Sequence, residues 1–285
     1  MANGTKTQVI AEIGASHNQD FSTAIELVLA AKQAGADAVK VQMYRPGSLT
    51  IKSDDPRFQI RSGPWSGQTL WELYEKTCMP YDWVPILKNV AESLGLFFFT
   101  TVYDTETVGI AEEMGIASYK ISSFEIDHLE LIDRVAQTGK RVYLSCGCGG
   151  FPDIWKAVST IRKYHKNLCL MHCVSKYPAK PEDMNLRTLL ELGRYTKGDV
   201  GLSDHTESTV IPAIAVSMGA RCIEKHIGMS PGGIDHFAMW PDAFKEMVHA
   251  IREAEVSQGV IHIGGSSQYR RQLVEGKLVR TANGQ

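Results

Sequence analysis

The feature that most constrains the fold is a regular alternation of short apolar or β-branched runs with longer amphipathic stretches. Eight such runs occur, and helical patterns such as STAIELVLAAKQAG and WVPILKNVAESLG lie between them, several ending at a glycine. Eight successive strand–helix units predict a parallel sheet closed as a (β/α)₈ TIM barrel. The predicted strands cover residues 8–13, 38–43, 96–101, 117–122, 141–146, 168–173, 199–203 and 221–226.

An open, doubly wound sheet is the alternative α/β architecture. That fold commonly carries a glycine-rich dinucleotide loop after its first strand, but AEIGASHNQ follows here. The length of 285 residues also fits a single barrel, which typically needs ~250 residues. The closed barrel is therefore the predicted fold.

Composition narrows the class of protein. The hydrophobic fraction of 44% and the charged fraction of 22% are typical of globular chains. A formal net charge of -2 argues against a broadly basic nucleic-acid surface. No stretch reaches the ~20 apolar residues of a membrane span, and the N-terminus lacks a signal-peptide pattern. We expect a cytoplasmic protein that binds neither nucleic acid nor membrane.

Two segments fall outside the alternation, and they define the expected domain organisation. The barrel domain is predicted to span residues 1–258, with a long insertion at 44–78 after the second strand. Long connections in compact domains are usually functional covers or mobile. Residues 259–285 form a short polar tail, which is either a docking extension or partly disordered.

Polar residues gather at the C-terminal ends of the predicted strands, where TIM-barrel active sites are built. A buried charge costs several kcal/mol unless it is paired or used, so this concentration is difficult to explain by folding alone. An active site at this rim is therefore expected. The polar residues are Glu12, Lys40, Gln42, Thr101, Lys120, Ser123, Glu125, Ser145, Ser175, Tyr177, Ser203, Asp204, His205, Glu224, Lys225 and His226.

Two lysines, Lys40 and Lys120, lie inside otherwise apolar strands. They favour an anion site, and hydroxyls would complete a cradle for a phosphate or carboxylate. Alternatively, the lysines are structural partners of Glu12 or Glu125, which are also candidate acid–base groups. The cradle hydroxyls are those of Thr101, Ser123, Ser145 and Ser203.

His205 and His226 are one strand–helix unit apart and can converge from adjacent strands. Two imidazoles suit a divalent transition metal such as Mn²⁺ or Zn²⁺. Two ordinary hydrogen-bonded rim histidines are an equally good interpretation of the pattern alone.

A series of motifs resembles the successive signatures of the sialic acid synthase family. These (β/α)₈ enzymes condense phosphoenolpyruvate with an N-acetylated hexosamine to form nine-carbon nonulosonic acids. The stretches SGQTLWELYEKTCMPYDW and YKISSFEI resemble the pseudaminic acid synthase branch more than the N-acetylneuraminate branch. The motifs, in order over residues 11–236, are AEIGASHNQD, AGADAVKVQ, YKISSFE, YLSCG, GLSDHT and EKHIGMSPGGIDH.

The resemblance implies a role for each matching residue. Glu12 matches a catalytic carboxylate, and His205 and His226 match ligands of Mn²⁺, Mg²⁺ or Co²⁺. By the same resemblance, we expect Lys40, Lys120 and His226 to act with Glu12 as catalytic residues. The matching phosphoenolpyruvate-binding positions are Lys40, Thr101, Lys120, Ser123, Ser145 and Ser203, and the sugar-contacting positions are Gln42, Glu125, Tyr177 and Asp235.

The chain also departs from the family pattern. Ser175 stands where the family has an asparagine beside phosphoenolpyruvate, so we assign it to the same half of the site. A sugar-contacting asparagine aligns near Trp65. The family usually continues into an antifreeze-like domain that covers the sugar of a dimer partner, and we expect this chain to lack it. The 44–78 insertion or another chain would then supply the cover, in a possible homodimer.

The resulting prediction is a metal-dependent condensation of phosphoenolpyruvate with an N-acylated aldohexose, releasing phosphate. The acceptor resembles N-acetylmannosamine or a diacetamido-trideoxyhexose. One alternative is a metal aldolase that acts on a sugar acid without phosphoenolpyruvate. The other is a catalytically silent sugar-binding barrel, but the joint presence of the lysines, histidines and Glu12 counts against it.

Overall fold

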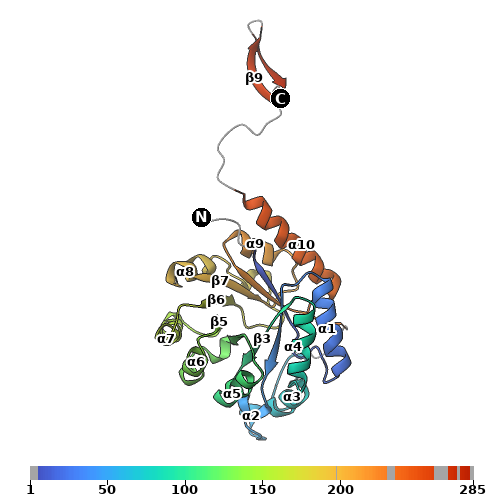
Figure 1. The fold of residues 1–285 in the computed structure, drawn as a ribbon, viewed down its shortest axis with the longest axis vertical. Helices are drawn as coiled ribbons and strands as arrows, with labels where there is room; N and C mark the ends of the chain where they lie inside the picture. The colour runs from blue at the N-terminus through green and yellow to red at the C-terminus, as the bar shows by residue number, and fades with distance from the viewer. Residues whose placement is uncertain (1–5, 197, 230–234, 260–268, 275–276, 283–285) are drawn as a thin grey trace.

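Eight parallel strands form a closed barrel in which every strand pairs with its neighbours in the chain and β8 pairs with β1 (Figure 1). The computed structural model describes residues 6–196, 198–229, 235–259, 269–274 and 277–282. The predicted TIM barrel is confirmed, and each strand end lies within one residue of its predicted position. The strands are β1 (Gln8–Glu12), β2 (Ala38–Met43), β3 (Phe97–Val102), β4 (Ser118–Ile121), β5 (Arg141–Ser145), β6 (Leu168–Cys173), β7 (Asp199–Asp204) and β8 (Cys222–His226).

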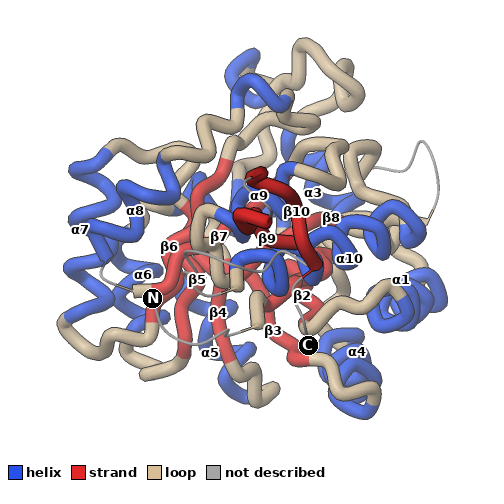
Figure 2. The backbone as a smooth tube through the Cα atoms, turned by 90° about the horizontal axis from the view of Figure 1, so that it is seen from above, coloured by secondary structure: helices blue, strands red, loops and turns tan. Residues whose placement is uncertain are grey.

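Helices surround the barrel, and seen from above the strands gather at the centre (Figure 2). The 44–78 insertion contains two of these helices, α2 and α3, and a short 3₁₀ turn at Pro56–Phe58. None of the described helices combines the length and the apolar character needed to cross a membrane. The helices are α1 (Phe21–Gln33), α2 (Pro46–Leu49), α3 (Leu70–Thr77), α4 (Trp83–Ser93), α5 (Thr105–Glu113), α6 (Leu129–Ala136), α7 (Phe151–Arg162), α8 (Thr188–Thr196), α9 (Ile211–Ser217) and α10 (Pro241–Gln258).

Local sequence signals set the ends of several helices. At the start of α1 the Asp20 side chain accepts a hydrogen bond from the Thr23 amide at 2.7 Å. Thr69 and Glu72 form a capping box at the start of α3. Gly95 and Gly115 follow α4 and α5 with φ of +72° and +66°, a conformation that L side chains rarely adopt. The glycines predicted to end these helices do so.

The interior of the barrel has an apolar lower layer. Alternate residues of each strand point inward, and the stacked rings of Phe99 and Tyr143, 4.8 Å apart, fill its centre together with Ile10, Met171 and Cys222. This layer closes the barrel below the polar residues at the strand ends. It therefore forms a rigid floor under the site.

The same two-residue period gives neighbouring polar residues of β8 different surroundings. Glu224 and His226 face the cavity above the apolar layer. Lys225 lies on the opposite face of the strand, where its ammonium group pairs with Asp204 at 2.7 Å. This buried ion pair joins β7 to β8 outside the cavity. Asp204 and Lys225 are thus rim residues that the structure does not bring to the site.

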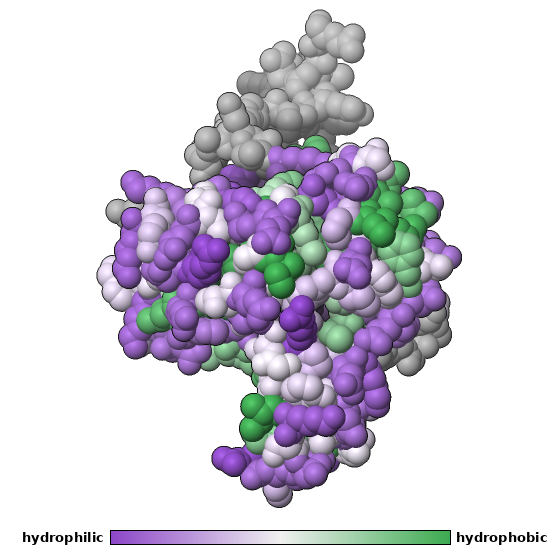
Figure 3. Space-filling view, turned by 60° about the horizontal axis from the view of Figure 1, so that its bottom comes forward, coloured by the Kyte–Doolittle hydropathy of each residue, from purple (hydrophilic) through white to green (hydrophobic). Residues whose placement is uncertain are grey.

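The tail predicted at 259–285 begins where α10 ends, at Gln258. Within it β9 (Tyr269–Val274) and β10 (Lys277–Ala282) pair as an antiparallel two-stranded sheet. The other tail residues after Gly259 lie outside the described residues. On the face shown in Figure 3 the barrel surface is mainly hydrophilic, with separate hydrophobic patches.

Gly201 provides a test of the packing inside the barrel. A Cβ atom at this position would lie 2.3 Å from Cys222 Sγ and 2.7 Å from the Cys222 carbonyl oxygen. We predict that Gly201→Ala lowers the free energy of unfolding by about 1–3 kcal/mol, as overpacking does elsewhere. Urea denaturation measures this change.

Gly109 in α5 offers a matched control, because a Cβ atom added there would have no described neighbour within 4 Å. Gly109→Ala should raise the free energy of unfolding by about 0.5–1 kcal/mol, since alanine restricts the unfolded chain. Equal effects of the two substitutions would contradict the packing seen around Gly201.

Candidate active site

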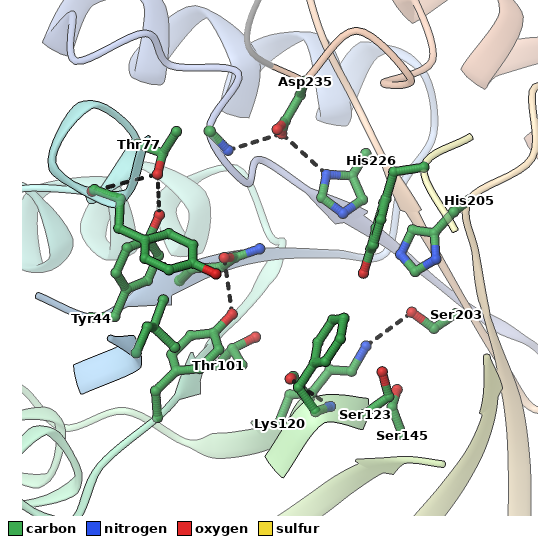
Figure 4. Close-up of a pocket in the computed structure, with 18 of the residues that line it drawn as sticks. Tyr44, Thr77, Thr101, Lys120, Ser123, Ser145, Ser203, His205, His226 and Asp235 are labelled. Carbon is green, nitrogen blue, oxygen red and sulfur yellow. Dashed lines mark hydrogen bonds and ion pairs between the residues drawn. The ribbon is translucent and has the colours of Figure 1, made fainter. Parts of the chain in front are cut away.

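A cavity of about 500 Å³ opens at the C-terminal ends of the barrel strands. It lies above the apolar layer, and side chains from the strands and from the 44–78 insertion line it (Figure 4). The predicted rim site is therefore a single cavity. The predicted site residues that line it are Lys40, Gln42, Thr101, Lys120, Ser123, Glu125, Ser145, Tyr177, Ser203, His205, His226 and Asp235.

Lys40, Lys120 and Glu224 line the cavity, and Glu12, which is fully buried and is not a lining residue, joins them in a charged cluster. Lys40 Nζ lies 2.5 Å from Glu12 Oε2 and 3.8 Å from Glu224 Oε1. Lys120 Nζ lies 2.6 Å from Glu224 Oε1. All four residues are at most 4% exposed. Each lysine is thus paired, as a buried charge must be.

The charged cluster shifts the pKa values of Glu224 and Lys120. Burial acts to raise the pKa of Glu224, but Lys120 and Lys40 outweigh it and hold that pKa below its ordinary value. Burial also acts to lower the pKa of Lys120, but the neighbouring Glu224 and other anionic groups produce a net increase. Glu224 is therefore a carboxylate and Lys120 an ammonium group at neutral pH.

The structure shows which carboxylates contact the lysines. Glu12 is the partner of Lys40, and it also accepts hydrogen bonds from the Gly14 amide at 3.0 Å and Gln42 Nε2 at 2.8 Å. Glu125 instead hydrogen-bonds to Ser122, and burial raises its pKa. The partner of Lys120 is Glu224, which the sequence pattern placed at the rim without a role.

The predicted cradle hydroxyls surround the lysines. Lys40 Nζ donates to Thr101 Oγ1 at 2.5 Å, and Lys120 Nζ donates to Ser203 Oγ at 3.0 Å. Within the described part of the chain the buried Ser145 Oγ has no hydrogen-bond partner, although it faces the cavity. A buried hydroxyl without a partner is unusual, and it indicates room for a ligand.

Ser175 is not among the lining residues. Its hydroxyl lies 2.6 Å from that of Ser123, which does line the cavity. Ser175 is therefore in a position to support the Ser123 hydroxyl rather than to contact a ligand directly.

His205 and His226 converge from β7 and β8, and their ring centroids are 5.5 Å apart. His205 Nδ1 donates to the Val174 carbonyl at 3.0 Å, and His226 Nδ1 donates to Asp235 Oδ2 at 3.2 Å. Each ring therefore keeps its Nε2 lone pair for a ligand. Figure 4 shows His226 directed toward Asp235 and Lys120 extending toward Ser203.

These two imidazoles fit a divalent metal ion. Burial, with His226 as the next cause, lowers the pKa of His205 to about 3, so the ring is neutral. A hydrogen bond from Nδ1 to a carbonyl or carboxylate oxygen is the usual support of a metal-binding histidine. Across the described ranges no group of three or more His, Cys, Asp or Glu side chains could hold a metal. Oxygens of substrate or water are suitable further ligands.

Asp235 lies among backbone and side-chain donors. Its Oδ2 accepts from the Ala15 amide at 2.9 Å and from Ser16 Oγ at 3.3 Å, as well as from His226. Gly14 allows this close approach, because a Cβ atom there would lie 2.4 Å from Asp235 Oδ2. The residue predicted to contact the sugar thus also orients a candidate metal ligand.

The other predicted sugar-contacting residues line separate walls of the cavity. Gln42 Oε1 accepts from the Tyr103 hydroxyl at 2.9 Å, while its amide donates to Glu12. The ring of Tyr177 lies 4.5 Å from that of His205 and 5.0 Å from that of Phe237. Gln42 thus adjoins the charged cluster, and Tyr177 adjoins the histidines.

The insertion covers the outer part of the cavity with largely apolar side chains. Trp65, the position aligned with a sugar-contacting asparagine, lines the cavity, and its ring lies 5.3 Å from that of His236. Residues of the same chain therefore contribute this wall of the cavity. The lining residues of the insertion are Tyr44, Leu49, Ile60, Trp65, Leu70, Leu73, Tyr74 and Thr77.

Sequence reasoning gave Glu224 no role and missed other lining residues. A position for Glu224 inside the cavity could have been inferred, because it shares the inward face of its strand with His226 two positions later. Tyr103 and Phe237 lie in loops after the strands, where no periodicity indicates which side chains point inward. Their positions depend on tertiary packing.

The sequence of this chain is similar to those of known proteins. The NeuB family model matches residues 27–262. The pseudaminic acid synthase of Helicobacter pylori is 36% identical over 256 residues, covering 88% of this chain and 75% of its own. The N,N'-diacetyllegionaminic acid synthase of Legionella pneumophila is 35% identical over 260 residues, covering 88% and 73%.

A solved structure agrees with this relationship. The N-acetylneuraminic acid synthetase of Leptospira borgpetersenii, solved with citrate, superposes with a TM-score of 0.83 at 26% identity. The match covers 93% of this chain and 89% of the other. The chain therefore belongs to the NeuB family, and it is an enzyme related to the synthases of pseudaminic, legionaminic and sialic acids.

Proposed function

We propose that this enzyme condenses phosphoenolpyruvate with an N-acylated aldohexose to a nonulosonic acid and releases phosphate. The observation that carries the proposal is the pairing of two buried lysines, ringed by hydroxyls, with two imidazoles in one cavity. The synthases among its relatives support the reaction class. The acceptor is N-acetylmannosamine-like or a diacetamido-trideoxyhexose.

Phosphoenolpyruvate would bind at the base of the cavity. Lys40 and Lys120 compensate its phosphate and carboxylate charges, because charge-assisted hydrogen bonds to such groups are strong. The hydroxyls of Thr101, Ser145 and Ser203 donate to the remaining oxygens. Ser123, supported by Ser175, completes the cradle.

The acceptor would lie between this anion site and the insertion. Gln42, Glu125, Tyr177 and Asp235 offer polar contacts to its hydroxyl and amide groups. The apolar side chains of the insertion can cover N-acyl methyl groups, which gain about 0.8 kcal/mol for each buried CH₂-sized unit. That the protein forms a homodimer and that it lies in the cytoplasm both remain predictions.

A divalent ion, whether Mn²⁺, Mg²⁺ or Co²⁺, would be held by His205 and His226 and would supply Lewis-acid polarisation of the acceptor's aldehyde oxygen. The residues of the chain orient the metal ligands and the substrate. Asp235 keeps His226 oriented, and burial keeps His205 neutral. The lysines hold phosphoenolpyruvate so that its carbon 3 can attack the aldehyde carbon.

Glu12 is proposed to orient the water that adds at carbon 2, after which the C–O bond to phosphate breaks. Its carboxylate is fixed by the Gly14 amide, Gln42 and Lys40, so it is preorganised for this role. The two lysines stabilise the leaving phosphate.

Phosphate release tests the proposed reaction. Metal-stripped enzyme is mixed with phosphoenolpyruvate and a panel of N-acetylated and diacetamido hexoses, with and without Mn²⁺. We expect phosphate release that requires both the ion and one of the sugars. Release of pyruvate from a sugar acid, without any need for phosphoenolpyruvate, would instead support the aldolase alternative.

Glu12→Gln removes the proposed water-orienting carboxylate and keeps its shape. We expect turnover to fall by ~100-fold or more, the usual contribution of a positioned acid–base group, while phosphoenolpyruvate still binds. Steady-state kinetics and calorimetric titration measure the two effects. Glu26→Gln, on the exposed face of α1, serves as the control. Wild-type turnover in Glu12→Gln would show that the assigned role is wrong.

His226→Ala removes one of the two proposed metal ligands. We expect loss of bound Mn²⁺, measured by metal analysis after dialysis, together with loss of activity. His249→Ala is a suitable control because His249 is an exposed helix residue. Full metal content in His226→Ala, or full activity of metal-free wild-type enzyme, would rule out the two-histidine site.

A further inference from the structure

We propose that Glu224 is an internal competitor for the anion at the base of the cavity, which limits how tightly phosphate is held and promotes its release after the reaction. The inference rests on the anion site of the proposed function and adds a residue to which that function gives no role. Three features of the charged cluster carry it.

The first feature is that Glu224 occupies the donors that a phosphate would need. Its Oε1 atom lies 2.6 Å from Lys120 Nζ, 3.8 Å from Lys40 Nζ and 3.3 Å from the Ser203 hydroxyl, which donates to it. These are two of the cations and one of the hydroxyls assigned to the anion. Glu224 therefore uses donors that the proposed function assigns to the anion.

The second feature is the contrast between the two carboxylates. Glu12 keeps two neutral donors, the Gly14 amide and Gln42 Nε2, whatever Lys40 binds. Among the described residues, Glu224 has only the Ser203 hydroxyl as a neutral donor. The buried Oε2 atoms of both carboxylates lack a hydrogen bond there, so the difference between the two lies in the neutral donors to Oε1. An anion that engages Lys120 and Ser203 would leave Glu224 without its partners, whereas Glu12 would stay anchored.

The third feature is charge. Two lysines and two carboxylates make the cluster neutral before any ligand arrives. A bound phosphate shares its cations with carboxylates a few ångströms away, and like charges repel strongly at such distances in a poorly solvated site. The affinity of the site for phosphate is thereby lowered. When the C–O bond has broken, Lys120 can return to Glu224 as phosphate leaves.

A merely structural role for Glu224 predicts the opposite sign. If the carboxylate served only to hold Lys120 in position, its removal would disorder the lysine and weaken anion binding. If it competes with the anion, its removal strengthens binding. The sign of the change in affinity therefore separates the two roles.

The test is calorimetric titration of inorganic phosphate into the full-length enzyme at constant pH and ionic strength. Glu224→Gln should bind phosphate about tenfold more tightly than wild type, a change of about 1.4 kcal/mol. Glu224→Asp, which keeps the charge one methylene further back, should give an intermediate gain. Glu112→Gln is the matched control, because it removes the carboxylate of another glutamate–lysine pair, with Lys140, away from the cavity. Its phosphate affinity should equal that of wild type.

Kinetics provide a second readout. If the enzyme turns over, phosphate should inhibit Glu224→Gln at about tenfold lower concentration than wild type. Should Glu224→Gln fail to fold without phosphate, Glu224→Asp supplies the affinity comparison, because it keeps a carboxylate near Lys120. Unchanged or weaker phosphate binding in both Glu224 variants would overturn the inference.

The outcomes also separate this inference from the proposed function. Tighter phosphate binding by the variants, without any condensation activity in the wild type, would support the internal competitor and refute the reaction. A wild-type enzyme and variants that all fail to bind phosphate would refute the anion site and the internal competitor together.

Discussion

The site depends on the neutralisation of four charges inside the barrel. An isolated ammonium group at the depth of Lys40 or Lys120 would be deprotonated or would destabilise the fold, because transfer of an unpaired charge from water costs several kcal/mol. Glu12 and Glu224 make both lysines tolerable. The same pairing decides how the site can act, because any anion that binds must share the lysines with these carboxylates.

The closed barrel makes this arrangement possible. Glu12 and Lys40 are aligned across β1 and β2, and Ser203 and Glu224 are aligned across β7 and β8. Because the inward side chains of neighbouring strands lie at nearly the same height, residues far apart in the sequence become direct neighbours. The apolar layer beneath them excludes water from one side. The charged cluster is thus held by paired strands of the barrel.

The two halves of the cavity have different origins. Strand residues form the anion half and the pair of histidines, and strands position side chains accurately. The 44–78 insertion and the loops after the strands form the acceptor half, with apolar rings and aliphatic side chains. Loops tolerate change better than barrel strands do, so this part of the cavity is the one expected to vary among related enzymes.

Much of the fold and part of the site could be predicted from the sequence, because both depend on short-range periodicity. The alternation of runs predicted each strand end to within one residue, and the position of polar residues at strand ends predicted Lys40, Lys120, His205 and His226 as cavity residues. The same reasoning also placed Asp204 and Lys225 at the rim, but they pair outside the barrel. A rim position alone does not say which face of a strand a side chain occupies.

The sequence by itself thus determined the barrel, its inward polar layer and the residue types available for chemistry. The reason is that side chains alternate between the two faces of a strand, and that a chain of strand–helix units is compatible with few folds. Only the tertiary structure decided which carboxylate pairs with which lysine, that Asp235 supports His226, and that the insertion lines the cavity. The physical reason is that the Lys120–Glu224 contact joins residues 104 positions apart, whose distance is set by barrel closure and not by local sequence. Asp235 is only nine positions from His226, but its place also depends on the Ala15 amide, 220 positions away.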